Sequence, residues 1–234
     1  MRVFMTYTAL PVLAAALLLF GGCGDDNDDG NGHTTKHSYE ITVTNLTAGQ
    51  PFSPVGIVLH TEGYHAFAVG EAASEGLEMM AEGGDVTTLL EDADGMDSVT
   101  ATASGSGIIL PGASETVTVN SLKETRLSLV SMLVNTNDAF TGLDGGDISE
   151  LASGESMTFY LNTYDAGTEL NSETAATVPG PAGNGEGLNS ARDDNDMVTL
   201  HPGVITSDDG LDSSTLTAIH KWDNPTAMVT ITRE

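Results

Sequence analysis

Cysteine, basic residues and aromatic residues are all scarce in this chain. Its 234 residues include one Cys and one Trp, and 7 Lys and Arg stand against 34 Asp and Glu. A single cysteine excludes an internal disulfide, so oxidised cysteines do not hold the fold together. The net charge of -27 repels nucleic acids and anionic headgroups, and it favours divalent cations, neutral glycans or basic partners. The same charge also suits any exported soluble protein, so it defines no site.

The sequence also lacks the motifs that usually identify an enzyme. No Gly-x-Ser-x-Gly motif is present, and the 6 His residues do not form the His-Glu-x-x-His pattern of a zinc site. The glycine-rich segment 180–187 lacks the Lys-Ser/Thr of a phosphate-binding loop. Paired carboxylates could serve a glycosidase, but the aromatic residues typical of sugar subsites are few. We therefore expect a protein that is not an enzyme and has no catalytic residues.

The N-terminus has the features of an export signal. Arg2 supplies positive charge, and the apolar run 12–20 is shorter than the roughly 20 residues that span a bilayer. The run leads into Phe-Gly-Gly-Cys, which resembles a bacterial lipobox except that Phe20 stands where Leu is usual. We predict a lipoprotein-type signal peptide over residues 1–22 and a lipid on Cys23. A plain secretory signal with an incidental cysteine is the alternative.

A disordered tether is expected next, and a single domain after it. Residues 23–37 are rich in Gly, Asp and Asn and have too few apolar side chains to fold. Residues 38–234 are sufficient for one core. Apolar residues alternate with polar ones in segments 39–44, 116–119, 126–134, 157–161 and 227–232. This period of two indicates an antiparallel β-sandwich or barrel, in which the first and last strands could pair.

Two short helices and one long loop interrupt this pattern. Segment 72–82 is rich in helix formers and is followed by a Gly-Gly pair, which predicts a helix with a clear end. A second short helix is predicted over residues 86–90. Residues 171–196 contain mostly Gly, Pro, Asn and acids and predict an irregular loop.

Carboxylates concentrate in two segments, 135–144 and 164–169, that each follow a predicted strand. If those strands are neighbours, both loops lie at related rims of the sandwich. Calcium takes about six to eight oxygens from carboxylates, carbonyls and water, and Asp138, Asp165 and Glu169 could supply some of them. On spacing alone, two ordinary acidic turns are the simpler interpretation.

Four groups of motifs follow one another in the order of a known family. They are YEITVTNLT (39–47) with QPFSP (50–54), ASEGLE (73–78) with AEGGD (81–85), SMLV (131–134) with NDAFTG (137–142), and DAGTE (165–169). Over about residues 38–233, the chain resembles the spondin N-terminal domain, which occurs in F-spondin and mindin and as stand-alone bacterial proteins.

The resemblance implies an all-β fold, an antiparallel C2-like β-sandwich with one or two short helices, that binds calcium at loop carboxylates. Carried over by position, the implied calcium ligands are Asp138, Asp165 and Glu169. Two positions depart from the family pattern. Glu169 stands where Asp is usual, so the carboxylate is carried on a longer side chain, and Ala139 replaces the usual Trp.

The expected function is that of an exported, calcium-binding adhesion or interaction module at the bacterial cell envelope. We expect it to be lipid-anchored to the outer membrane or cell surface, or otherwise secreted or periplasmic. Its membrane contact would be the N-terminal lipid only. The expected partner is an extracellular or cell-surface protein or a neutral glycan, and not a nucleic acid. A glycan-active hydrolase that uses the acidic loop residues, and a purely structural envelope lipoprotein, are the alternatives.

Overall fold

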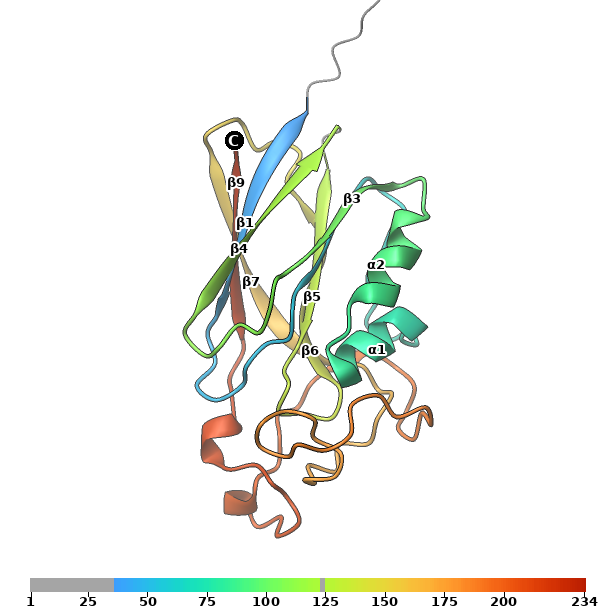
Figure 1. Cartoon of the computed structure of the whole chain (residues 1–234), viewed down its shortest axis with the longest axis vertical. Coiled ribbons are helices and arrows are strands. Elements are labelled where there is room, and N and C mark those ends of the chain that lie inside the picture. The colour runs from blue at the N-terminus through green and yellow to red at the C-terminus, as the bar shows by residue number, and fades with distance from the viewer. Residues whose placement is uncertain (1–35, 123–124) are drawn as a thin grey trace, which may run out of the picture. The chain divides into compact units, whose positions relative to one another are not determined.

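The segments with alternating apolar residues all form strands of one nine-stranded sheet (Figure 1). A computed structural model describes residues 36–122 and 125–234. The strands are β1 (His37–Asn45), β2 (Gly56–His60), β3 (Val99–Ser104), β4 (Ser114–Ser121), β5 (Arg126–Met132), β6 (Ala139–Asp147), β7 (Ser156–Asp165), β8 (Thr199–Leu200) and β9 (Ala227–Arg233). Sequence patterns predicted β1, β4, β5, β7 and β9, and missed the others.

The strands pair in the order β3-β2-β5-β6-β7-β9-β1-β4, with β8 added beside β7. All of these pairs are antiparallel. The predicted pairing of the first and last strands is confirmed, because Ile41 of β1 lies opposite Ile231 of β9. Strand β7 belongs to both halves of the sheet: residues 156–161 pair with β9, and residues 162–165 pair with β6.

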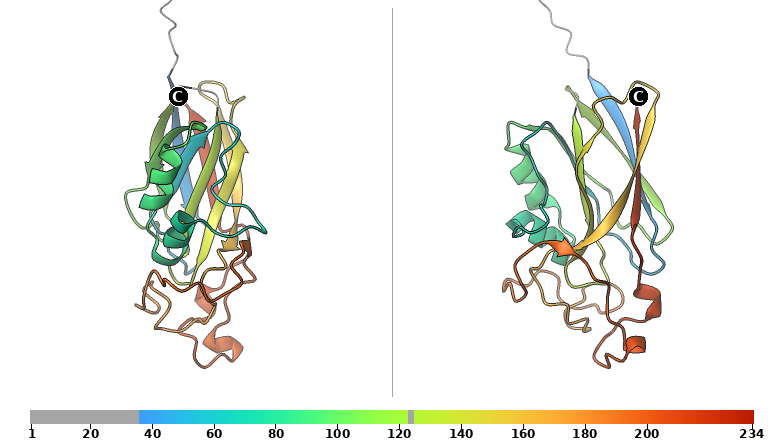
Figure 2. Two further views of the ribbon diagram at one scale, coloured as in Figure 1. Left: turned by 90° about the vertical axis from the view of Figure 1, so that its right-hand side faces the viewer. Right: turned by 180° about the vertical axis from the view of Figure 1, so that it is seen from behind.

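The expected C2-like sandwich is therefore only partly supported. The fold is all-β and antiparallel with two short α-helices, as predicted. However, β7 connects the two halves without a break, and the sheet wraps into a nearly barrel-shaped arrangement (Figure 2). The result is not clearly two separate layers.

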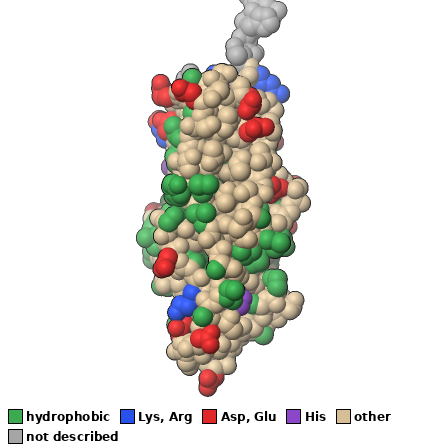
Figure 3. Space-filling model, turned by 90° about the vertical axis from the view of Figure 1, so that its left-hand side faces the viewer, with side chains coloured by type: hydrophobic (Ala, Val, Ile, Leu, Met, Phe, Trp, Pro, Cys, Tyr) green, Lys and Arg blue, Asp and Glu red, His purple; other side chains and the backbone are tan. Residues whose placement is uncertain are grey.

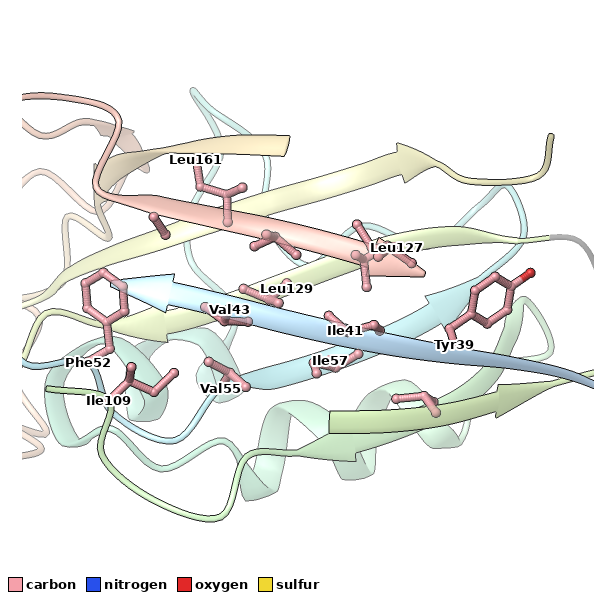
Figure 4. Packing of buried hydrophobic residues seen from close by; sticks show 14 of the residues in the cluster. Tyr39, Ile41, Val43, Phe52, Val55, Ile57, Ile109, Leu127, Leu129 and Leu161 are labelled. Carbon is pink, nitrogen blue, oxygen red and sulfur yellow. The ribbon is translucent and has the colours of Figure 1, made fainter. Parts of the chain in front are cut away.

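The sheet encloses an apolar core made by alternate residues of its strands (Figure 4). On β1, Tyr39, Ile41 and Val43 are fully buried, and the residues between them are more exposed. Each such aliphatic side chain contributes about 1.5–3 kcal/mol through the area it removes from water. The strand alternation thus follows from burial of one face of the sheet.

Two helices cover the outer face of β2, β5 and β6 (Figure 2). Helix α1 (Glu75–Gly83) begins where the Ser74 side chain accepts a hydrogen bond from Leu77 N at 3.2 Å, and it ends at Gly84 with φ +70°. The helix begins three residues later than the predicted 72–82 and ends at the Gly-Gly pair, as predicted. Helix α2 (Thr87–Asp94) runs further than the predicted 86–90. Because the helices bury its second face, β2 is buried at every residue and shows no alternation.

The segment between β7 and β9 is mostly irregular, as predicted for residues 171–196. It contains β8 and two 3₁₀ turns, Ser207–Asp209 and Ala218–His220. The predicted signal peptide (1–22), Cys23 and most of the tether lie outside the described residues. None of the helices among residues 36–122 and 125–234 is long and apolar enough to cross a membrane.

Candidate metal site

Asp138 lies in the turn between β5 and β6 and ties that turn to the segment after β7. The turn is closed by Thr136, whose hydroxyl binds Leu133 O at 2.6 Å and accepts from Ala139 N at 3.1 Å. Asp138 is fully buried. Its Oδ2 accepts hydrogen bonds from Thr168 N at 2.9 Å and Glu169 N at 3.2 Å, and its Oδ1 has no donor.

Asp165 ends β7 directly beside this turn, because it lies opposite Ala139 in the β6–β7 ladder. It is 4% exposed. Its Oδ1 accepts from Gly167 N at 2.8 Å, and its Oδ2 accepts from Asn171 Nδ2 at 2.6 Å. Gly167 has φ +71°, and a side chain there would collide with the Met197 backbone. The local turn therefore requires glycine.

His201 is a titratable neighbour of Asp165, with Nε2 3.9 Å from Asp165 Oδ2. Its Nδ1 accepts a hydrogen bond from Gly203 N at 2.9 Å, so the ring proton of the neutral form is on Nε2. Burial lowers the pKa of His201, and Asp165 opposes that effect. The ring thus presents a dipole to Asp165 and not a full positive charge at neutral pH.

The side chain of Glu169 has a different set of neighbours. It is 2% exposed, and its Oε1 accepts from Asn137 Nδ2 at 3.1 Å while Oε2 has no donor. Glu82 is the acid that acts on it most strongly. The structure therefore brings Asp138 and Asp165 together and places the Glu169 backbone against Asp138, but the Glu169 carboxylate binds Asn137.

Three further side chains of this region escaped the sequence patterns. Glu173 is 1% exposed; its Oε1 accepts from Ile205 N at 3.3 Å and its Oε2 has no donor. Its φ of +58° is rare for a non-glycine residue and marks a constrained position. Glu82 of α1 is fully buried, and both its Oε1 and Asn171 Oδ1 lack a donor. The one sequence signal was the like-charged pair Glu78 and Glu82, one helical turn apart.

Burial dominates the electrostatics of these acids. It raises the pKa of Asp138 to about 8, and the Asp165 carboxylate adds to the effect. Burial also raises the pKa of Glu169 to about 7 and that of Glu173 to about 7. The pKa of Glu82 is raised for the same reason. All these shifts reflect the cost of holding a negative charge out of water.

Within the described residues no Lys or Arg forms an ion pair with these acids, and only Glu82 has its pKa lowered by a basic residue, Arg192. The Lys and Arg ion pairs of the described residues are Arg126–Glu62, Arg192–Glu78, Arg192–Asp196 and Lys221–Asp209. None of them includes Asp138, Asp165, Glu169, Glu173 or Glu82. Buried acceptor oxygens that have neither a hydrogen-bond donor nor a Lys or Arg ion-pair partner fit a hard metal ion.

The geometry limits the kind of metal shell that could form. Within residues 36–122 and 125–234, no three His, Cys, Asp or Glu side chains converge on one point as a complete ligand group. A cation here would thus need amide, hydroxyl or backbone oxygens and water in addition to the carboxylates. Calcium accepts such a mixed and flexible shell.

Comparison with known families gives the class of this all-β protein. The family model Spondin_N matches residues 35–180, which is more than half of the chain. The chain belongs to the spondin N-terminal domain family. The matched part includes α1, Asp138, Asp165 and Glu169. No curated protein matches the chain significantly.

Proposed function

We propose that the protein is an exported calcium-binding interaction module with a C2-like sandwich, tethered at the bacterial cell envelope by a lipid on Cys23. Without the lipid it would be secreted or periplasmic. The observation that carries the calcium proposal is the neighbouring burial of Asp138 and Asp165. Asp138 Oδ1 has no donor, and no Lys or Arg of the described residues pairs with either acid.

Two carboxylates, Asp138 and Asp165, would hold the cation with the Asn171 amide oxygen and water, and Glu173 would add negative charge nearby. Asp138 Oδ1, Asn171 Oδ1 and Glu173 Oε2 are buried acceptors without donors. The Asp165 carboxylate raises the pKa of both Asp138 and Glu173, in each case as a smaller effect than burial. Calcium would supply the missing positive charge and would fix the turn after β5 to the loop after β7. The family resemblance implies Asp138, Asp165 and Glu169 as ligands, whereas Asn171 and Glu173 come from the structure.

Two surface features are available to a partner. The loops around the buried acids carry apolar side chains that are 40–58% exposed, namely Leu170, Leu188, Met197, Leu200, Ile205 and Ile219. In addition, a hollow of about 430 Å³ is lined by Leu46, Lys221 and Trp222. Apolar side chains and a tryptophan are typical contacts for a protein or a neutral glycan. We propose such a partner, held by loops that calcium orders.

Burial of the acids also favours binding over hydrolysis. A glycosidase needs two carboxyl groups that face a bound sugar across a cleft. Asp138, Asp165 and Glu169 are at most 4% exposed, so a polysaccharide could not reach them without a rearrangement of the loops. We therefore propose that the protein is not an enzyme.

Thermal melts in chelator, in calcium and in magnesium test the calcium proposal. We expect calcium to raise the Tm by several degrees, because a ligand that binds only the folded state stabilises it. An Asp138→Asn, Asp165→Asn variant should lose this rise. A matched variant, Asp92→Asn, Asp212→Asn, changes two exposed acids and should keep it. A rise that survives in the first variant would refute the site.

Binding arrays then test the proposed partner. We expect calcium-dependent retention of a protein or neutral glycan, and loss of retention in the Asp138→Asn, Asp165→Asn variant. Calcium binding without any retained ligand would contradict the interaction function and favour a structural envelope protein.

A further inference from the structure

The hollow lined by Leu46, Lys221 and Trp222, which we call the Trp222 hollow, lies beside the segment that leads into β9. Trp222 is the one tryptophan of the chain, and it is half-buried. It packs against the main apolar core and against a smaller apolar cluster in the loops after β7. Its side chain also lines the hollow, whose volume of about 430 Å³ is within the range of small-ligand sites.

Contacts with the rest of the fold hold the walls of the hollow in place. The walls are formed by two segments, 46–48 and 221–223. Leu46 N donates a hydrogen bond to Thr226 O at 2.9 Å. Gly49 approaches Ile219 so closely that an added Cβ would collide with the Ile219 backbone. The hollow is therefore preformed, and a ligand would not have to order its walls.

The polar groups at the hollow suit a neutral ligand that carries hydroxyl groups. Lys221 Nζ donates to both carboxylate oxygens of Asp209, at 2.8 and 2.9 Å, and an ammonium group has three donors, so a further donor is available. Asp223 is exposed and can accept hydrogen bonds. A donor, an acceptor and an indole match a sugar unit, which has hydroxyl groups at its rim and C–H groups on its faces. The net charge of -27 selects against an anionic sugar.

His201 connects Trp222 to the candidate metal site. The His201 side chain is fully buried, and its ring centroid lies 5.2 Å from that of Trp222 with an interplanar angle of 56°. Its Nε2 is 3.9 Å from Asp165 Oδ2 and is buried without a hydrogen-bond partner. Gly203 N donates to Nδ1 at 2.9 Å, so the ring cannot turn without losing that hydrogen bond. One fixed ring is therefore a neighbour of both Asp165 and Trp222.

The backbone of Thr163 ties the same two regions together. Thr163 O accepts a hydrogen bond from His201 N at 3.1 Å, and Thr163 N donates to Asn224 Oδ1 at 2.8 Å. Thr163 lies on β7, two residues before Asp165. A change at Asp165 thus has two short routes to the segment that carries Trp222, one through the His201 ring and one through the Thr163 backbone.

We propose that the Trp222 hollow binds a sugar unit of a neutral glycan, and that His201 couples this hollow to the cation at Asp165. His201 is a positioning residue, because it contacts Trp222 and not the sugar. A cation would fix Asp165 and the ring beside it, so that Trp222 would be held in place before a sugar binds. The coupling rests on the calcium-binding function proposed above, whereas the sugar site does not. By linkage, calcium and the glycan would each tighten the binding of the other.

Intrinsic fluorescence reports on this hollow directly, because Trp222 is the one tryptophan of the chain. The purified full chain is titrated with cellohexaose and maltohexaose, in chelator and in calcium, and with an oligogalacturonate as the anionic probe. We expect a saturable change of fluorescence with a neutral hexasaccharide and none with the anionic probe. Calcium should tighten the binding of the neutral hexasaccharide by about fivefold or more.

Two variants separate the sugar site from its coupling to calcium. Trp222→Ala, followed by titration calorimetry, should lose sugar binding and keep calcium binding. His201→Gln should keep sugar binding in chelator and lose the gain in affinity that calcium gives, since glutamine is polar but has no ring to support Trp222. His65→Gln changes a histidine whose side chain is exposed, and it should behave as the unaltered chain does.

The outcomes separate this inference from the calcium function. No response to either neutral hexasaccharide overturns the sugar site, whether or not the chain binds calcium. Equal affinity for the sugar in chelator and in calcium, in a chain that binds calcium, overturns the coupling through His201. Sugar binding by a chain that binds no calcium refutes the calcium function and the coupling and supports the sugar site. Equal binding of the anionic probe overturns the assignment to a neutral glycan. Because the unaltered chain gives all these results, a variant that fails to fold does not prevent the test.

Discussion

Without calcium, the stability of the fold should fall as the pH rises from about 4 to about 8. The pKa of Asp138 is raised from its usual 3.8 to about 8, mainly because the carboxyl is buried and then because Asp165 lies beside it. Between these two values the folded chain keeps a proton that the unfolded chain has released. The free energy of unfolding must then decrease with rising pH. The stabilising contribution is complete below pH ~4 and is lost as the pH passes ~8.

The size of the effect follows from the same two pKa values. At about 1.4 kcal/mol per pH unit, the Asp138 difference corresponds to about 6 kcal/mol. The raised pKa values of Glu169 and Glu173 act in the same direction. A domain of this size has a total stability of about 5–15 kcal/mol, and each kcal/mol shifts Tm by about 2–4 °C. We therefore expect Tm in chelator to fall by at least about 10 °C between pH 5 and pH 8.

Calcium should reverse this trend, because a cation replaces the proton as the counter-charge. Its effect on Tm should be small at pH 5, where protons compete for the carboxylates, and largest at pH 8. Differential scanning calorimetry of the unit Thr34–Glu234, at several pH values with chelator or calcium, measures both curves. Asp138→Asn should make the chelator curve less steep, since an amide does not titrate, and Glu169 and Glu173 would account for the slope that is left. A Tm in chelator that stays level or rises between pH 5 and pH 8 would refute the reasoning.

Two substitutions test other parts of the structure. Gly167→Ala should destabilise the fold by about 2–4 kcal/mol and weaken calcium binding, because φ is +71° and the new Cβ would be 2.7 Å from Met197 N. Gly63→Ala is the matched control, because Gly63 also has a positive φ, +99°, but has open space around it. If Gly63→Ala and Gly167→Ala lowered Tm equally, the Met197 contact would not explain the loss. Asp144→Ala removes the acceptor of Ala66 N and Ser128 Oγ and should cost about 1–3 kcal/mol without changing calcium affinity. Weaker calcium binding in the Asp144→Ala variant would show that the calcium site extends along β6 as far as Asp144.

The strands that sequence patterns found and missed differ in what covers them. Strands β1 and β9 bury one face in the core and leave the other more exposed, so apolar and polar residues alternate. Strand β2 is buried on both faces by α1 and α2, which removes the alternation. Strand β6 is rich in Gly and Asp and resembled part of an acidic loop. It is a strand because β5 and β7 pair with it on either side, and local sequence does not contain that information.

The site shows the same division between local and tertiary information. Asp138 and Asp165 stand in compact motifs beside strand ends, so sequence patterns could place them on related loops, and the structure puts Asp165 opposite Ala139, next to Asp138. Glu82 was hidden in a helix whose acids normally face solvent, and its burial depends on residues 187–189 folding over the helix end. Glu173 stands in a loop without any motif, and its position depends on backbone contacts with Asn137 and Thr215.

Burial, and not total charge, distinguishes the candidate metal site from the other acids of this protein. Acidic side chains are spread over the visible face in Figure 3, where water and salt screen them at little cost. The buried acids have no such screening, and each ionised group without a partner would cost several kcal/mol. Protons neutralise Asp138, Glu169 and Glu173 only partly near neutral pH, because their pKa values are about 8, about 7 and about 7. The proposed divalent cation would supply the same neutralisation across that pH range. It would thereby stabilise the loops around the buried acids, whose exposed apolar side chains are the proposed contacts for a partner.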